Sequence, residues 1–157
     1  MPLEWTSGRT LTGLFGERAQ NATRDLVYEL AEAAAERMRD LAREFTPKDS
    51  GELASQWEVT PVRVGVQDAL VVYEATVFNE SPIAHLIEYG TDPHVIEGGQ
   101  SFTDPASGQR VFVHEIEHPG TRGIFMLINA AAWVEADLER LLGPLVRRWA
   151  VRIERGR

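Results

Sequence analysis

A long apolar stripe with helical spacing is the feature of this sequence that most constrains its fold. Between Glu17 and Glu44 apolar residues recur at steps of three or four, and Pro47 ends the pattern. The stripe consists of Leu26, Leu30, Ala34, Met38, Leu41 and Phe45. A helix of this length spans about 40 Å at ~1.5 Å per residue, which exceeds what a small domain needs for its own core. We therefore expect part of its alanine-rich face, residues 31–35, to pack against another copy of the chain.

The composition removes several classes of protein. The chain has 157 residues, a net charge of −8 and no cysteine. This charge argues against unspecific binding to the phosphates of nucleic acid, and the lack of cysteine excludes disulfides and thiolate zinc sites. No apolar run approaches the length of a membrane span, and the N-terminal sequence lacks the order of a signal peptide. The expectation is a soluble protein made in the cytoplasm.

The remaining patterns complete an α+β outline. Residues 1–16 are expected to form an N-terminal arm, and residues 17–157 a single domain. Alternating residues predict a hairpin of strands near 57–66 and 71–78, interrupted at Pro61. Residues 81–91 predict a short helix that ends at Gly90, with Ile83, Leu86 and Ile87 facing inward and the pair His85 and Glu88 in solvent.

The second half of the chain is expected to begin with a loop and end with a helix. Residues 92–110 are rich in turn formers and predict a loop at the tip of a hairpin. A stripe from Leu127 to Ile153 predicts a C-terminal helix that is kinked or divided at Gly143-Pro144. The predicted fold is a long N-terminal helix and a C-terminal helix packed on one face of a small antiparallel sheet with an extended hairpin loop.

The segment 113–120, VHEIEHPG, matches the zinc-peptidase pattern H-E-x-x-H through His114, Glu115 and His118. That chemistry needs a helix, which places both histidines on one face about 6 Å apart. Pro119 disfavours helical backbone at His118, and the β-forming residues of 111–118 predict a strand instead. Four strand residues span roughly 13 Å, too far for the two imidazoles to share one metal ion in the usual way. The favoured interpretation is a strand without metal, and a small zinc hydrolase is the alternative.

Three motifs stand in order between about Phe45 and Trp133. The first comprises Thr46, Pro47, Asp49, Ser50, Gly51, Leu53, Ser55 and Trp57; the second Ala84, Ile87, Glu88, Tyr89, Gly90 and Thr91; the third His118, Pro119, Gly120 and Thr121, followed by Phe125. Together they resemble the tail-completion, or head–tail joining (neck), proteins of tailed bacteriophages, a minor tail protein type. Ile83 stands where that family commonly has an aromatic residue.

The resemblance implies a structural virion protein without catalytic activity, metal or cofactor. It would form a homo-oligomeric ring, with six copies expected from tail symmetry, at the head-proximal end of the tail. Its partners would be neighbouring tail and head-connector proteins; DNA would pass through the lumen without specific binding, and no membrane would be involved. It would be made in the host bacterial cytoplasm and reside in the virion. A tail terminator ring is the alternative position.

Subunit contacts are predicted from residue type. Interfaces between proteins are enriched in aromatic residues and arginine. Four residues are predicted to contact a neighbouring subunit on this basis: Trp5, Phe15, Tyr89 and Arg122.

Overall fold

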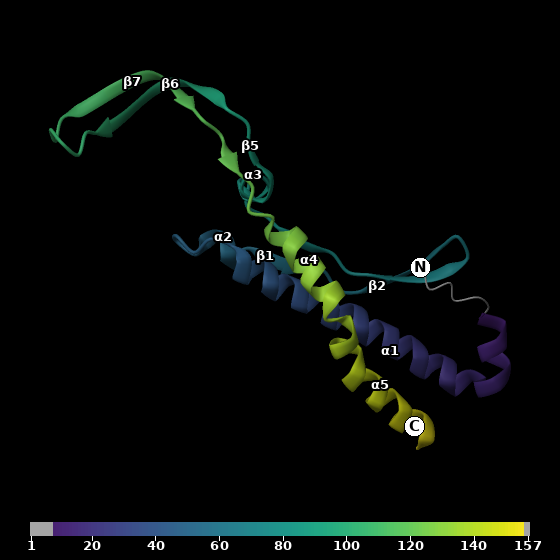
Figure 1. Ribbon diagram of the computed structural model, residues 1–157. Helices are drawn as coiled ribbons and strands as arrows, with labels where there is room; N and C mark the ends of the chain where they lie inside the picture. Colours follow the sequence, from purple (N-terminus) through teal and green to yellow (C-terminus); the bar gives the residue numbers. More distant parts are fainter. Residues whose placement is uncertain (1–7, 156–157) are drawn as a thin grey trace. The chain divides into compact units, whose positions relative to one another are not determined.

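The computed structural model describes residues 8–155 and has an α+β architecture, as the sequence predicts (Figure 1). The elements in chain order are α1 (Gly8–Phe45), α2 (Glu52–Ser55), β1 (Trp57–Val59), β2 (Arg63–Gln67), β3 (Leu70–Glu74), β4 (Val77–Asn79), α3 (Ala84–Tyr89), β5 (Gly90–Thr91), β6 (His94–Thr103), β7 (Arg110–His118), β8 (Thr121–Arg122), α4 (Met126–Ala136) and α5 (Leu138–Glu154). The described strands form four antiparallel pairs: β1 with β4, β2 with β3, β5 with β8, and β6 with β7.

Where the sequence predicts one domain from residue 17 onward, the contacts divide the chain into two compact units. Unit 1 runs to Glu80 and resumes at Met126, so it contains α1, the strands β1–β4 and both C-terminal helices. Unit 2 runs from Ser81 to Phe125 and contains α3 and the strands β5–β8.

The core of unit 1 forms where α1 packs against α4 and α5. α1 also contacts β1, β3 and β4. The buried apolar residues come from these elements and from α2: Ala22, Ala35, Leu41, Ala42, Ala54, Trp57, Met126, Ala130, Val134 and Leu145. Several are alanines, whose small side chains let helices approach closely. Part of the alanine-rich face of α1 is therefore used within the chain, since Ala35 is buried there.

α1 begins earlier than the sequence predicts. The expected arm ends at residue 16, but the helix already starts at Gly8. Gly8, Gly13 and Gly16 lower the summed helix propensity of this stretch, and propensity is a weak guide that structural context overrides. Phe15 thus belongs to α1, whereas Trp5 lies outside the described residues.

The C-terminal helical region is divided at a different residue from the one predicted. The break falls at Asp137, and Pro144 lies inside α5. The backbone N–H of Asp137 still donates to the carbonyl of Trp133 at 3.0 Å, so only one residue leaves the helical pattern. Asp137 stands at the N-cap of α5 and belongs to the residue types that favour helix starts, although its side chain makes no capping hydrogen bond.

The predicted hairpin of unit 1 is confirmed, with its interruption at Pro61. β1–β4 and β2–β3 are two parts of one ribbon, and between them Thr60 donates its N–H to the carbonyl of Thr76 at 2.9 Å. The ribbon turns at Asp68 and Ala69, which both have positive φ (50° and 66°). Positive φ at both central residues is typical of the type I′ turn that suits the twist of a two-residue hairpin.

Unit 2 is built around a long hairpin of β6 and β7. Residues 111–118 lie in the strand β7, as predicted, but the residues of β6 were expected to form a loop. Gly98 and Gly99 have low strand propensity and form an irregularity without cross-strand partners, but the residues on either side of them pair with β7 and keep β6 extended. At the tip, hydrogen bonds from the backbone N–H of Ala106 and the hydroxyl of Ser107 hold the pKa of Asp104 below its usual range.

The short helix α3 differs from its prediction in which residues it buries. Ile83 and Leu86 are exposed, whereas Glu88 is 6% exposed. Within unit 2, α3 packs on β5 and β8, which have only two residues each. So small a surface leaves the other side of the helix uncovered within unit 2. The expectation of an inward apolar face was therefore wrong for Ile83 and Leu86, and the expectation of a solvent-exposed Glu88 was wrong as well.

Candidate assembly surfaces

The first family motif forms an internal clamp at the end of α1. The indole N–H of Trp57 donates to the hydroxyl of Thr46 at 2.7 Å, and that hydroxyl donates to the carbonyl of Ala42 at 2.6 Å. Both Thr46 and Trp57 are almost fully buried, at 2% and 4% exposed. The motif therefore fixes β1 against the last turn of α1.

Two residues outside the motif complete this clamp and were missed by the sequence reasoning. The guanidinium of Arg43 donates to the carbonyls of Ala54 (3.2 Å) and Trp57 (3.3 Å), and the side-chain amide of Asn79 donates to the carbonyl of Leu53 (2.9 Å). Their partners are backbone atoms, which leave no pattern in the sequence.

The exposed part of the first motif shapes the chain between α1 and α2. Gly51 has φ +80°, a conformation that favours glycine, and the hydroxyl of Ser50 accepts the N–H of Glu52 at 3.3 Å. Pro47 is exposed and Leu53 is half-buried. These motif residues determine local backbone geometry in unit 1.

The second and third motifs, about thirty residues apart in the sequence, meet in unit 2. In the β5–β8 pair, Gly90 lies opposite Arg122 and Thr91 opposite Thr121. The hydroxyls of Thr91 and Thr121 are 3.1 Å apart, and the N–H of Thr121 also donates to the Thr91 hydroxyl at 3.1 Å. The ladder closes the base of the long hairpin.

Three glycines allow the close approach of the segments that contain β5 and β8, which we call the crossing of unit 2. A β-carbon on Gly90 would lie 2.3 Å from the carbonyl oxygen of Thr121, and one on Gly120 would lie 2.3 Å from that of Thr91. Both residues have φ +81°. A β-carbon on Gly123 would lie 2.6 Å from the carbonyl oxygen of Glu88. The two segments thus approach more closely than any side chain allows.

The histidines of VHEIEHPG belong to the strand and its exit. His118 lies opposite His94, with ring centroids 5.0 Å apart. The Nδ1 atom of His118 accepts a hydrogen bond from the N–H of Gly120 at 3.2 Å. His114 and Glu115 are exposed on β7, and Pro119 follows the strand. The zinc-peptidase pattern requires a helix here, and the strand contradicts that reading. No cluster of three or more potential metal-binding side chains occurs within residues 8–155.

Two predicted contact residues occupy the outer surface of this crossing. Tyr89 is 67% exposed and, with Arg122 and Phe125, lines a shallow depression on unit 2. Arg122 is exposed as well. Of the other two, Phe15 lies on α1, and Trp5 is outside the described residues.

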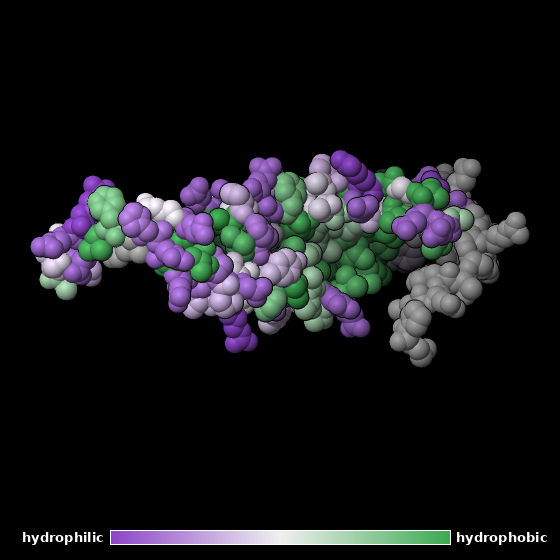
Figure 2. All heavy atoms as spheres, turned by 90° about the horizontal axis from the view of Figure 1, so that it is seen from above, coloured by the Kyte–Doolittle hydropathy of each residue, from purple (hydrophilic) through white to green (hydrophobic). Residues whose placement is uncertain are grey.

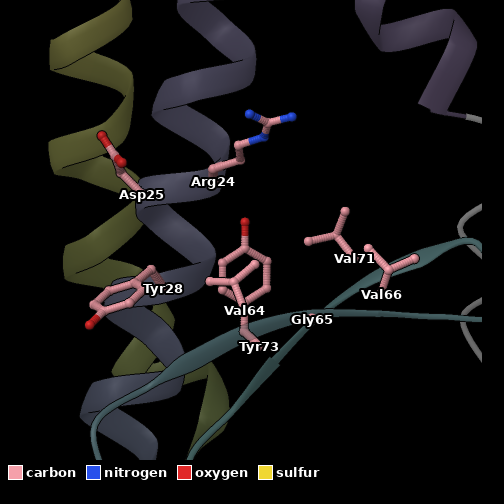
Figure 3. A pocket seen from close by; sticks show the side chains of 8 residues that line it. All are labelled: Arg24, Asp25, Tyr28, Val64, Gly65, Val66, Val71 and Tyr73. Carbon is pink, nitrogen blue, oxygen red and sulfur yellow. The ribbon is translucent and has the colours of Figure 1, made fainter.

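Unit 1 has a surface groove of its own, with mostly apolar walls. Figure 3 shows that three of its lining residues, Arg24, Asp25 and Tyr28, come from α1 and the other five from β2 and β3. On this hairpin Val64, Val66, Leu70 and Val71 are all exposed, Val66 to 76%. On the face that Figure 2 shows, hydrophobic residues, in green, lie among hydrophilic ones, in purple.

Ion pairs join α5 to α1 beside this groove. Arg148 lies 2.9 Å from the carboxylate of Glu29, and Arg152 contacts both Glu29 and Asp25. Hydrogen bonds from Arg152 and then Arg148 hold the pKa of Glu29 below its ordinary value. Part of the basic C-terminal segment thus meets acidic partners within its own chain.

Comparison with known proteins finds a family match over part of the chain. Residues 14–90 match the family model described as "Bacteriophage HK97-gp10, putative tail-component". No curated protein and no solved structure matches the chain. In the described part of the chain, no helix has the length and apolarity to cross a membrane. Residues 14–90, which carry the first motif and the second as far as Gly90, thus match the HK97-gp10-like family of phage tail components.

Proposed function

We propose that this tail component forms a homo-oligomeric ring around the DNA channel, at the head-proximal end of a phage tail. There it completes the tail or joins it to the head connector, with tail and connector proteins on either side. Six copies fit the symmetry of tails. The alternative is a tail terminator, which would form the same kind of ring at a neighbouring position along the tail.

The observation that carries the proposal is the uncovered β6–β7 hairpin. Among the described elements its two strands contact mainly each other, and Val95, Val111 and Phe112 on it are exposed. An isolated two-stranded hairpin is marginally stable in water, and a long one needs a further packing surface. A neighbouring subunit supplies such a surface in a ring.

Exposed anchors and charge support the same arrangement. Tyr89 and Arg122 are residue types that commonly anchor interfaces, and both are accessible on unit 2. The net charge of −8 suits a channel protein, because an acidic lumen does not grip the phosphates of passing DNA.

Mass measurement by light scattering tests the ring. We expect purified protein, alone or with the adjacent tail and connector proteins, to give a species of about six times the 17.6 kDa chain mass. Electron microscopy of that species should show rings with a central channel. A chain that stays monomeric alone and with these partners contradicts the proposal, as does stoichiometric zinc that is lost in His114→Ala.

A further inference from the structure

The β6–β7 hairpin has one face that is acidic and uncovered. Side chains alternate between the two faces of a strand, so Glu97, Glu115 and Glu117 share one face, with Val95 opposite Glu117. All three glutamates are exposed. We call these four residues the acidic face.

The acidic face carries like charges that oppose each other directly. Glu97 and Glu115 are cross-strand partners. Like charges at this position destabilise a strand pair, so the free hairpin is weakened by its own sequence. A cationic surface laid over this face would remove the repulsion and cover Val95, which is also exposed.

A basic surface of matching kind lies on α5 in unit 1. Arg140 and Arg147 are seven residues apart, which places them on one side of α5, and Arg155 follows as the C-cap residue of this helix. The side of Arg140 and Arg147 differs from the one that buries Leu145 and pairs Arg148 and Arg152 with α1. All three arginines are exposed, and the guanidinium of Arg140 lies 3.7 Å from the carboxylate of Asp137. We call them the basic stripe.

We propose that the acidic face of one subunit docks on the basic stripe of a second copy of the chain. The inference rests on the proposed ring and gives it a specific contact. Chains with a net charge of −8 repel each other, so self-association needs local complementarity. The contact joins two different surfaces head to tail, and such contacts generate closed rings when the rotation between subunits closes.

Paired charge reversals test this contact. The first variant, Glu97→Arg with Glu115→Arg, makes the acidic face basic; the second, Arg147→Glu with Arg155→Glu, makes the basic stripe acidic. Each variant alone would juxtapose like charges, and we expect self-association at least about 10-fold weaker than that of the unmodified chain. In a mixture, each variant's altered surface meets a complementary surface on the other, so we expect the ring mass to return.

The control places the same charge change elsewhere. Glu52→Arg with Glu58→Arg alters two exposed residues of unit 1 that belong to neither surface, and it should assemble like the unmodified chain. Circular dichroism melts establish that all variants fold.

The outcomes separate this inference from the proposed ring. If the unmodified chain forms rings and the two reversal variants still form them separately, the contact is wrong and the ring stands. If each variant fails alone and mixing restores nothing, the surfaces do not join two copies, and the inference is again overturned. An unmodified chain that never assembles overturns both proposals.

Discussion

The hydroxyl of Thr46 makes two buried hydrogen bonds, one to Ala42 and one from Trp57. We predict that Thr46→Val destabilises unit 1 by about 1–3 kcal/mol, because it leaves the buried indole N–H without a partner. Chemical denaturation checks this. Thr76→Val, at an exposed position of the hairpin, is the matched control and should change the free energy of unfolding by less than about 0.5 kcal/mol. Equal losses in both variants would contradict the clamp.

The glycines at the crossing of unit 2 are also expected to tolerate no larger residue without a loss of stability. Gly90→Ala and Gly120→Ala each add a β-carbon 2.3 Å from a backbone oxygen, at a φ that alanine rarely adopts. We predict a loss of more than about 1 kcal/mol for each. The readout is faster hydrogen exchange at the amides of Ile124 and Phe125, which donate to the carbonyls of Ile87 and Glu88.

Gly99→Ala gives the matched control within the same unit. A β-carbon there meets nothing within 4 Å, and its φ is not in the positive range. Its exchange rates should stay close to those of the unmodified chain. Unchanged exchange rates in Gly90→Ala would mean that the crossing accommodates a β-carbon without a loss of stability, which would contradict the prediction.

At the scale of elements, local patterns predicted those that carry their own periodicity. The stripe of α1 and the alternation of β7 were sufficient to predict both. β6 was missed because its strand state depends on pairing with β7 and not on its glycine-rich sequence. The break at Asp137 was misplaced because a proline can remain inside a helix whose packing against α1 compensates the lost hydrogen bond.

The ion pairs between α1 and α5 give a prediction about the pH dependence of stability. The pKa of Glu29 is lowered in the folded chain, so its ion pairs stabilise the fold above the ordinary value of about 4.5. That contribution is lost as the pH falls through the lowered pKa. Glu29→Gln should therefore cost about 0.5–1 kcal/mol at neutral pH, a modest figure because the pair is partly exposed.

Thermal melts over a range of pH test the contribution of these ion pairs. The difference between Glu29→Gln and the unmodified chain should shrink below pH 4.5 and vanish at the acidic end. Glu32→Gln, an exposed position on α1, is the control and should show little difference at any pH. A deficit of Glu29→Gln that persists in acid would assign its cause to packing and not to charge.

At the scale of the whole molecule, most motif residues act inside the units and not on their surfaces. The first motif clamps α1 to β1, and the second and third build the crossing beneath the long hairpin. The sequence could show that these residues belong together but not that they meet, because contacts over long separations leave no local periodicity. Among the described residues, candidate partner surfaces are Tyr89 with Arg122, the groove between α1 and the β2–β3 pair, the β6–β7 hairpin and the basic stripe of α5.

Tyr89 offers the simplest test of a surface role. Its side chain is 67% exposed, so Tyr89→Ala should leave the melting temperature of the monomer almost unchanged. If Tyr89 anchors a subunit contact, the same change should weaken self-association by roughly 30-fold, the effect of an anchor worth about 2 kcal/mol. Tyr89→Phe keeps the aromatic area and should assemble nearly normally. Light scattering across a dilution series measures the self-association of both variants. Undiminished assembly of Tyr89→Ala would place the contact elsewhere. A lowered melting temperature of Tyr89→Ala would mean that Tyr89 stabilises unit 2 itself.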